Sequence, residues 1–305
     1  MDVLFSMMQV TLEEGFAYAL LAFGVYITYS ILDFPDLSVD GTVPLGGVIA
    51  GSLILHGVNP WLCCLIAFLA GMAAGSVTGL LHVRLRIRPL LCGILVMTGL
   101  LSVNFALIML GTGGKTIAAF FQLPTISTAA PVRFFPAYVG GFQLRKLLVA
   151  FAIAMACKYL LDAYLNTRSG LLLRATGSNA QYVTMLARNP GGMKILGLAL
   201  GNGFSAFAGC IIAQQKGTAD LQMGTGMVVI GLASVIIGLS LFGRIRGLRQ
   251  TSSVLLGAIF YKACLQLALA IGVPSEYFKL LTAVLLTVFL VFSDRVGKKG
   301  GVRLE

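Results

Sequence analysis

The chain has 305 residues, of which 58% are hydrophobic and 11% charged, and its mean hydropathy is +0.93. Because a soluble domain carries about 25% charged residues, this composition excludes an ordinary soluble protein and predicts one that lies within a membrane. The net charge of +11 does not indicate nucleic-acid binding, since the basic residues fall in short loops between apolar stretches.

Nine apolar stretches approach the roughly 20 residues that a helix needs to cross a bilayer. They cover about 15–32, 42–57, 61–83, 89–111, 147–165, 192–213, 225–243, 251–272 and 277–293. The first two are short and are joined by an acidic segment that contains Pro and Gly, so the predicted number of spans is eight to ten. The expected fold class is all-α: one polytopic transmembrane domain over residues 1–305.

The basic residues predict the orientation of these spans. If the nine spans alternate, 14 of the 22 basic residues fall on one side, in the loops at 84–88, 166–194 and 244–249 and in the tail at 294–305. An excess of Lys and Arg marks the cytoplasmic side. We therefore expect a cytoplasmic C-terminus and an external N-terminus.

Two regions of the chain resemble each other. Aligning Asp36 with Asp220 also aligns Gly47 with Gly231, and each region follows one apolar span and opens another. In the nine-span topology the two units are inverted: repeat 1 covers about 13–111 and repeat 2 about 192–293. An external segment at 112–146 and a linking helix at 147–165 separate them. Inverted repeats with broken helices are a recurring plan in transporters, although chance identity in Gly-rich helices is the alternative.

The acidic segment between the first two stretches is the sharpest chemical feature, with Asp33, Asp36 and Asp40 inside eight residues. Three carboxylates could bind Mg²⁺ and a diphosphate, as in a membrane prenyltransferase, but no second acidic cluster shares their side. Asp33 and Asp36 could instead cap a break between two half-helices, which Pro35 and Gly41 would enforce. The break could also line a solute pathway, because irregular backbone at membrane depth is tolerated where it is buried or lines a cavity.

Polar residues elsewhere in the spans are further candidates for a pathway. They are Asn104, Lys158, Asp162, Asn202, Gln214, Lys262 and Gln266. We place Asn104, Asn202 and Asp220 in the predicted pathway together with Asp33, Asp36 and Asp40. Lys158 and Asp162 are four residues apart on one helix, a spacing that favours an ion pair. Small residues at positions 71, 75 and 79 predict close helix packing within the chain, with a dimer seam as the alternative.

Catalytic, metal and cofactor sites are not predicted. The segment Gly111–Thr116 resembles a phosphate-binding loop, but Met109 stands where that motif needs its first Gly. The six cysteines lack metal-ligand spacing, and no catalytic constellation is present. The sequence therefore favours a protein that is not an enzyme.

The longest loop on the basic side, 166–191, is expected to contain a short helix over residues 178–188, stopped by the segment Asn189–Gly192. This helix is too short and too polar to span a membrane. It would expose Tyr182, Met185 and Leu186 together, which indicates a docking partner.

Several phrases support a resemblance over roughly residues 13–293. The segments Gly15–Gly24 and Gly170–Asn179 resemble the first span and the cytoplasmic loop of ABC importer permeases in the branched-chain amino acid and ribose permease family. The segment Asp33–Thr42 together with Gly231–Gly238 is similar to a subgroup that includes importers of tryptophan or tyrosine and many members of unknown substrate.

This resemblance implies a bacterial cytoplasmic-membrane protein that transports a small solute. An amino acid is the expected class of solute, and aromatic amino acids are among the candidates. It implies four kinds of partner: a second permease copy, ATP-binding ABC ATPase subunits, an extracytoplasmic solute-binding protein and the solute. The segment 178–188 would be the coupling helix, with Ser178, Tyr182, Val183, Leu186 and Arg188 as the ATPase-coupling residues. Its end, Ala187-Arg188-Asn189, departs from the family pattern.

Two other functions stay open from the residues alone. An ion-coupled secondary transporter that works without an ATPase would fit the inverted repeats and would use Asp40 or Asp220 as its ion site. A Mg²⁺-dependent prenyltransferase would use Asp33, Asp36 and Asp40.

Overall fold

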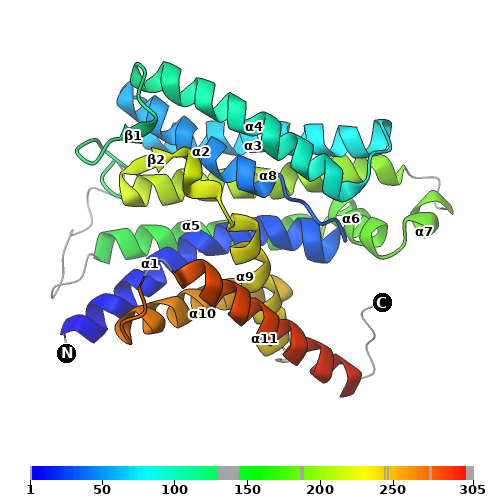
Figure 1. Cartoon of the computed structure of the whole chain (residues 1–305). Coiled ribbons are helices and arrows are strands. Elements are labelled where there is room, and N and C mark those ends of the chain that lie inside the picture. Colours follow the sequence, from blue (N-terminus) through cyan, green and yellow to red (C-terminus); the bar gives the residue numbers. More distant parts are fainter. Residues whose placement is uncertain are drawn as a thin grey trace.

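The protein is a bundle of membrane-length helices, seen in a computed structural model that describes residues 2–129, 144–185, 189–243, 245, 247–274 and 277–299 (Figure 1). Its elements are α1 (Asp2–Val25), the π-helical turn η1 (Tyr26–Ile31), α2 (Val39–Leu55), α3 (Pro60–Arg84), α4 (Pro89–Thr112), β1 (Ile117–Ala119), α5 (Leu144–Leu165), α6 (Arg168–Ser178), α7 (Ala180–Met185), α8 (Pro190–Lys216), β2 (Thr218–Asp220), the 3₁₀ turn η3 (Leu221–Gly224), α9 (Met227–Phe242), α10 (Gln250–Ala270) and α11 (Phe278–Lys299). Within the described residues, seven helical segments are long and apolar enough to span a membrane, and the shorter apolar helices are α2 and residues 278–291 of α11. The prediction of an all-α polytopic protein is confirmed.

Local sequence signals set the helix ends. Asn59 and Asn189 each precede a proline at the first helical position, and each amide oxygen accepts a hydrogen bond from a backbone N–H of the first turn. At the other end, α4 and α8 stop at Gly113 and Gly217, which adopt the left-handed conformation at φ 68° and 72°.

The bundle has two distinct ends (Figure 1). At one end, which we call the sheet end, β1 and β2 pair antiparallel with Ile117 opposite Asp220. At the other, the α7 end, α6 and α7 connect α5 to α8. Basic residues gather at the α7 end: Arg84, Arg86, Arg88, Arg168, Arg174, Lys194 and Arg249.

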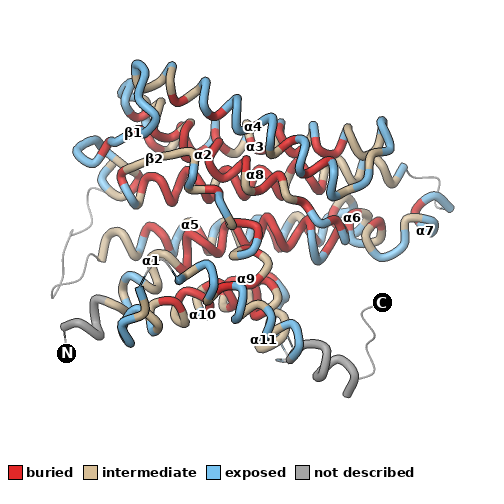
Figure 2. The backbone as a smooth tube through the Cα atoms, in the orientation of Figure 1, coloured by how far each residue is buried: buried red, intermediate tan, exposed pale blue. Residues whose placement is uncertain are grey.

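The core lies along residues 15–25 of α1 and 197–214 of α8, which form almost continuous runs of buried residues (Figure 2). Helix α8 packs against α2 and α3, whereas α1 packs against α9 and α10. The two central helices also contact each other, and a Cβ added to Gly24 would lie 2.4 Å from the carbonyl oxygen of Gly201. Small residues allow this approach in an environment where helices associate by close packing.

The small residues of α3 serve the same purpose. A Cβ added to Gly71, Gly75 or Gly79 would lie within 2.7 Å of α8 backbone atoms. This face of α3 is therefore occupied within the chain, which is the intramolecular alternative of the two that the sequence left open.

Candidate functional site

The segment between α1 and α2 is a break in which the chain turns at membrane depth. The helix α1 ends in the π-helical turn η1, and Asp33 follows with φ at 52° and an exposed side chain. Phe34 is buried, and regular structure resumes only at Val39. Non-regular backbone at this depth is tolerated because protein covers it.

Asp36 is the centre of a buried polar network in this break. Its Oδ1 accepts hydrogen bonds from the backbone N of Ser38 at 2.9 Å and from the Ser38 hydroxyl at 2.6 Å. Its Oδ2 accepts one from Asn202 Nδ2 at 2.7 Å, and Asn202 Oδ1 lies 3.0 Å from the hydroxyls of Ser38 and Thr42. A buried carboxylate persists only when its oxygens are satisfied in this way, so the network ties the break to the middle of α8.

Asp40 links the break between α1 and α2 to the segment between α8 and α9. It lies in the first turn of α2, yet its Oδ2 accepts from the N of Gly226 at 3.1 Å and its Oδ1 from the N of Val228 at 2.8 Å. It thus caps the N-terminus of α9. A Cβ on Gly224 would lie 2.1 Å from the carbonyl oxygen of Asp40. The N-termini of the two short helices α2 and α9 therefore meet at Asp40, where the helix dipoles favour a negative charge.

Of the other two predicted pathway residues, Asn104 lies beside this meeting point, whereas Asp220 lies in β2 at the sheet end. Asn104, fully buried in α4, donates from Nδ2 to the carbonyl oxygen of Gly41 at 2.9 Å. Asp220 ends β2 and precedes η3. Asn104 Oδ1 and Asp220 Oδ1 are buried and have no hydrogen-bond partner in the described part of the chain.

The three carboxylates of the first break face separate partners. Asp36 binds Ser38 and Asn202, Asp40 binds the start of α9, and Asp33 is exposed. Among the described residues, no group of three His, Cys, Asp or Glu side chains is placed to hold a metal ion.

The predicted coupling segment is divided between two helices. The prediction of a single helix that starts at Ser178 is wrong, because Ser178 ends α6 and the break between the helices falls at Asn179, which is extended at φ −158°. Asn179 Oδ1 accepts from the N of Tyr182 at 3.0 Å and so starts α7. Val183 is fully buried, whereas Tyr182 and Met185 are 56% and 81% exposed. Leu186 and Arg188 lie outside the described residues.

Comparison with known proteins identifies the family. The chain matches the family described as branched-chain amino acid transport system, permease component, over residues 7–290. The chain belongs to this permease family. This confirms the resemblance seen in the sequence.

Relatives cover most of the permease. It is 36% identical over 279 residues to a tyrosine transport system permease protein of Clostridioides difficile, a match covering 92% of this chain and 88% of that protein. It is 29% identical to an uncharacterized protein of Rickettsia prowazekii, over 92% of this chain and 95% of that one. It is 28% identical to an autoinducer 2 import system permease protein of Salmonella paratyphi B, over 86% of this chain and 70% of that protein. No solved structure matches.

The α6–α7 region of the permease touches the first break. A Cβ added to Gly177 would lie 1.8 Å from the carbonyl oxygen of Ile31, so the end of α6 rests on the end of η1 without an intervening side chain. Leu173 of α6 and Leu32 of the break both approach Gly197 of α8. The end of α6 and the break are therefore in direct contact.

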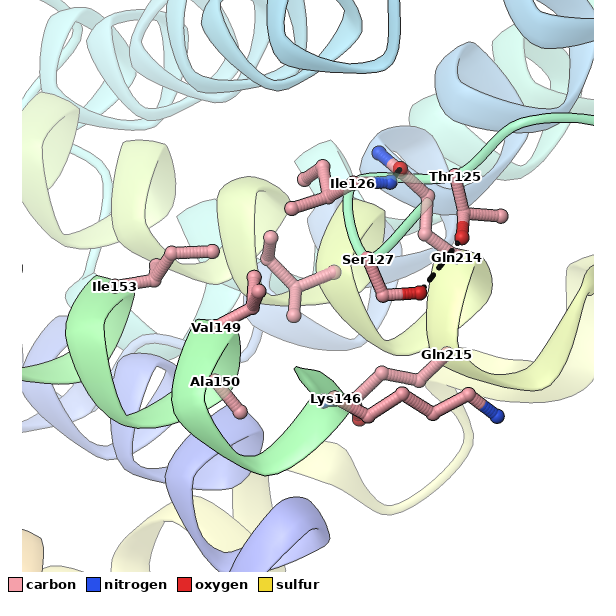
Figure 3. A pocket seen from close by; sticks show the side chains of 10 residues that line it. Thr125, Ile126, Ser127, Lys146, Val149, Ala150, Ile153, Gln214 and Gln215 are labelled. Atoms are coloured by element: carbon pink, nitrogen blue, oxygen red, sulfur yellow. Dashed lines mark hydrogen bonds between the residues drawn. The ribbon is translucent and has the colours of Figure 1, made fainter. Parts of the chain in front are cut away.

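A small cavity lies near the sheet end, between the 125–127 segment, α5 and α8 (Figure 3). Gln214 Oε1 accepts there from the N of Ile126 at 2.9 Å. Its volume of about 30 Å³ suffices for one or two water molecules and is too small for an amino acid.

Two charged clusters were only partly found from the sequence. Lys158 and Asp162 lie 3.7 Å apart as their spacing predicted, but Asp162 also binds Arg249 at 3.2 Å. Lys262 Nζ lies 2.8 Å from Glu14 Oε2 and 3.5 Å from the centre of the Tyr18 ring. The sequence indicates Lys262 as a candidate polar residue but does not by itself indicate Glu14. Glu14 could have been found from the rule that a cation inside a membrane needs a partner of opposite charge.

Proposed function

We propose that this permease is the membrane-spanning subunit of an ATP-driven importer and that α7 receives a separate ATPase subunit. The observation that carries the proposal is the pair of exposed apolar side chains on α7, Tyr182 and Met185, at the end where the basic residues gather. Large apolar groups exposed beside charged loops mark a protein contact. Leu186 and Arg188 extend the proposed coupling segment, and the buried Val183 anchors α7 rather than docking.

The orientation follows from the same end. Its loops and helix ends, together with α6, carry Arg84, Arg86, Arg88, Arg168 and Arg174, so the α7 end is cytoplasmic by the positive-inside rule. The protein is then a multi-pass bacterial inner-membrane permease whose sheet end faces the extracytoplasmic solute-binding protein.

The proposed inverted repeats gain support from how the helices pack. Helix α8 contacts α3 and α2 as α1 contacts α10 and α9, and α4 lies on α2 as α11 lies on α9. This pattern is that of two equivalent units, α1–α4 and α8–α11, in which the first helix of each unit packs against the second and third helices of the other. Each unit has its break after the first helix, and the breaks meet at Asp40. We place the solute pathway here, with Asp36, Asn202, Asn104 and Asp220 around it.

We further propose that the solute is an amino acid, with aromatic ones as the first to test. The permease shares 36% identity with a tyrosine transport system permease protein. A second permease copy completes the assembly, because the importer needs two coupling segments for a pair of ATPases.

A single charge on α7 tests the docking site. In vesicles containing the permease, its ATPase and its binding protein, Met185→Glu should abolish solute-stimulated ATP hydrolysis and uptake. Gln181→Glu is the matched control, since it adds the same charge to an exposed position of the same helix. Equal activity of the two variants would disprove the docking site. Uptake by the permease alone, driven by a proton or sodium gradient, would replace the importer with a secondary transporter.

A further inference from the structure

A second, larger cavity opens at the α7 end and is distinct from the proposed pathway. It has a volume of about 410 Å³ and lies where the end of α5, α6, the start of α10 and the first residue of η1 come together. Polar and charged side chains dominate its wall: Tyr26, Asp162, Asn166, Arg174, Arg249 and Gln250. Because Asp162 is three residues from the end of α5 and Arg249 directly precedes α10, the cavity lies at the level of the membrane–water interface.

The single carboxylate in this wall is already satisfied. Asp162 Oδ1 accepts from the Thr251 hydroxyl at 2.5 Å, and Oδ2 accepts from Arg249 Nη1 at 3.2 Å. Lys158 Nζ lies 3.7 Å from the same Oδ2. Among the described residues that line the cavity, two cations, Arg174 and Arg249, face one carboxylate, which leaves one excess positive charge in the wall. Lys158 does not line the cavity but adds a further positive charge beside Asp162.

The remaining groups supply several hydrogen-bond donors. The Tyr26 hydroxyl donates to Gln250 Oε1 at 2.6 Å, which occupies the amide oxygen and leaves the amide nitrogen as a donor. Arg249 engages Asp162 through one nitrogen, and its side chain is 61% exposed. Arg174 brings a whole guanidinium to the wall. An arginine offers five N–H donors in a planar fork that matches phosphate oxygens.

We propose that this cavity binds a phosphate-bearing anion, either the headgroup of an acidic phospholipid or free phosphate. Excess positive charge, unused donors and interfacial depth fit this ligand better than a neutral solute or a cation. The anion would bridge Arg174 on α6 to Arg249 beside α10. Because α6 leads into α7 and rests on η1, the occupied site would hold the α7 end against the membrane helices.

The test uses the full-length permease in nanodiscs. In the first arm, part of a neutral phosphatidylcholine bilayer is replaced by phosphatidylglycerol, and native mass spectrometry counts the acidic lipid retained after transfer to detergent. In the second arm, inorganic phosphate is titrated against chloride at equal ionic strength in neutral nanodiscs, and the thermal unfolding midpoint is followed.

Arg174→Gln should weaken binding about tenfold, the loss expected for one charge-assisted hydrogen bond. Arg168→Gln is the control, because Arg168 is exposed on the same helix and does not line the cavity. Retained phosphatidylglycerol assigns the site to a lipid, and a shift with phosphate alone assigns it to the free ion. The absence of both signals, or equal binding by the two variants, overturns the proposal.

Discussion

Replacing Asn202 by Leu tests whether the Asp36 network holds the first break to α8. Leucine has nearly the shape of asparagine, so the change removes hydrogen bonds without opening a cavity. The Asp36 carboxylate loses the donor that lies 2.7 Å away, while the hydroxyls of Ser38 and Thr42 keep Asp36 Oδ1 and the Val39 carbonyl oxygen as acceptors. The loss is thus concentrated on one charged, fully enclosed group.

The expected loss of unfolding free energy follows from the hydrogen bonds that Asn202→Leu removes. A hydrogen bond to a charged group contributes about 1.5–3 kcal/mol, and a buried group left unsatisfied costs a similar amount. An average interhelical hydrogen bond in a membrane protein contributes about 0.6 kcal/mol. We therefore expect Asn202→Leu to lower the free energy of unfolding by about 2–3 kcal/mol, measured by denaturant titration of the purified permease in mixed micelles.

Asn104→Leu is the matched control. Asn104 is also fully buried in a membrane helix, but it makes one bond, to the Gly41 carbonyl oxygen, and its Oδ1 has no partner within the described chain. The substitution removes the buried Oδ1 that has no partner and also breaks the hydrogen bond to Gly41. The net change in the free energy of unfolding should therefore stay within about 1 kcal/mol. If Asn104→Leu destabilises the permease as much as Asn202→Leu, the network does not hold the break and our reasoning fails.

Three further substitutions probe other contacts. Gly46→Ala should prevent recovery of monodisperse protein on gel filtration, because its Cβ would lie 1.8 Å from the Ala206 carbonyl oxygen; Gly99→Ala, with open space around it, should be tolerated. Asp40→Ala should lower the unfolding free energy by about 1–2 kcal/mol through the lost cap of α9, whereas an unchanged value would mean that the cap contributes nothing. Glu14→Gln should cost about 1–2 kcal/mol, because the ammonium of Lys262 loses its carboxylate counter-ion and keeps only the Tyr18 ring beside it. In a double-mutant cycle with Lys262→Met the two losses should not add, and strict additivity would show that the pair is not coupled.

The sequence predicts well those features that depend on one segment at a time. Hydropathy alone placed the membrane helices, since each apolar stretch must satisfy its own backbone hydrogen bonds as a helix. The spacing of Lys158 and Asp162 predicted their pairing for the same reason: both lie on one helix. The break after the first span followed from the local cluster of acidic residues, Pro and Gly.

Contacts between distant segments could not be derived in this way. Asp40 was predicted as a pathway residue, and nothing in its local sequence indicates that it caps α9, whose N-cap Gly226 is 186 residues away. Ser178 and Asn179 are both good helix-capping residues, and local sequence does not choose between them; in the structure α6 continues through Ser178, with Gly177 packed on Ile31. Glu14 gained its role from Lys262, 248 residues further on. In each case the contact that a side chain makes depends on a residue that is distant in the sequence.

The breaks, the polar network and the α7 end form one connected structure in the permease. Gly177 places α6 directly on η1, η1 leads into the segment that Asp36 ties to Asn202, and Asp40 carries the contact on to α9. Each of these contacts is either a close backbone approach or a hydrogen bond. A gradual increase in the distance between the two groups would therefore break the contact. Packed interfaces of this kind exchange between discrete arrangements rather than deforming continuously. A force applied at α7 would therefore reach the break as a rearrangement of hydrogen-bond partners, and Asn104, which already donates to the carbonyl oxygen of Gly41 and whose Oδ1 has no partner among the described residues, provides an alternative acceptor.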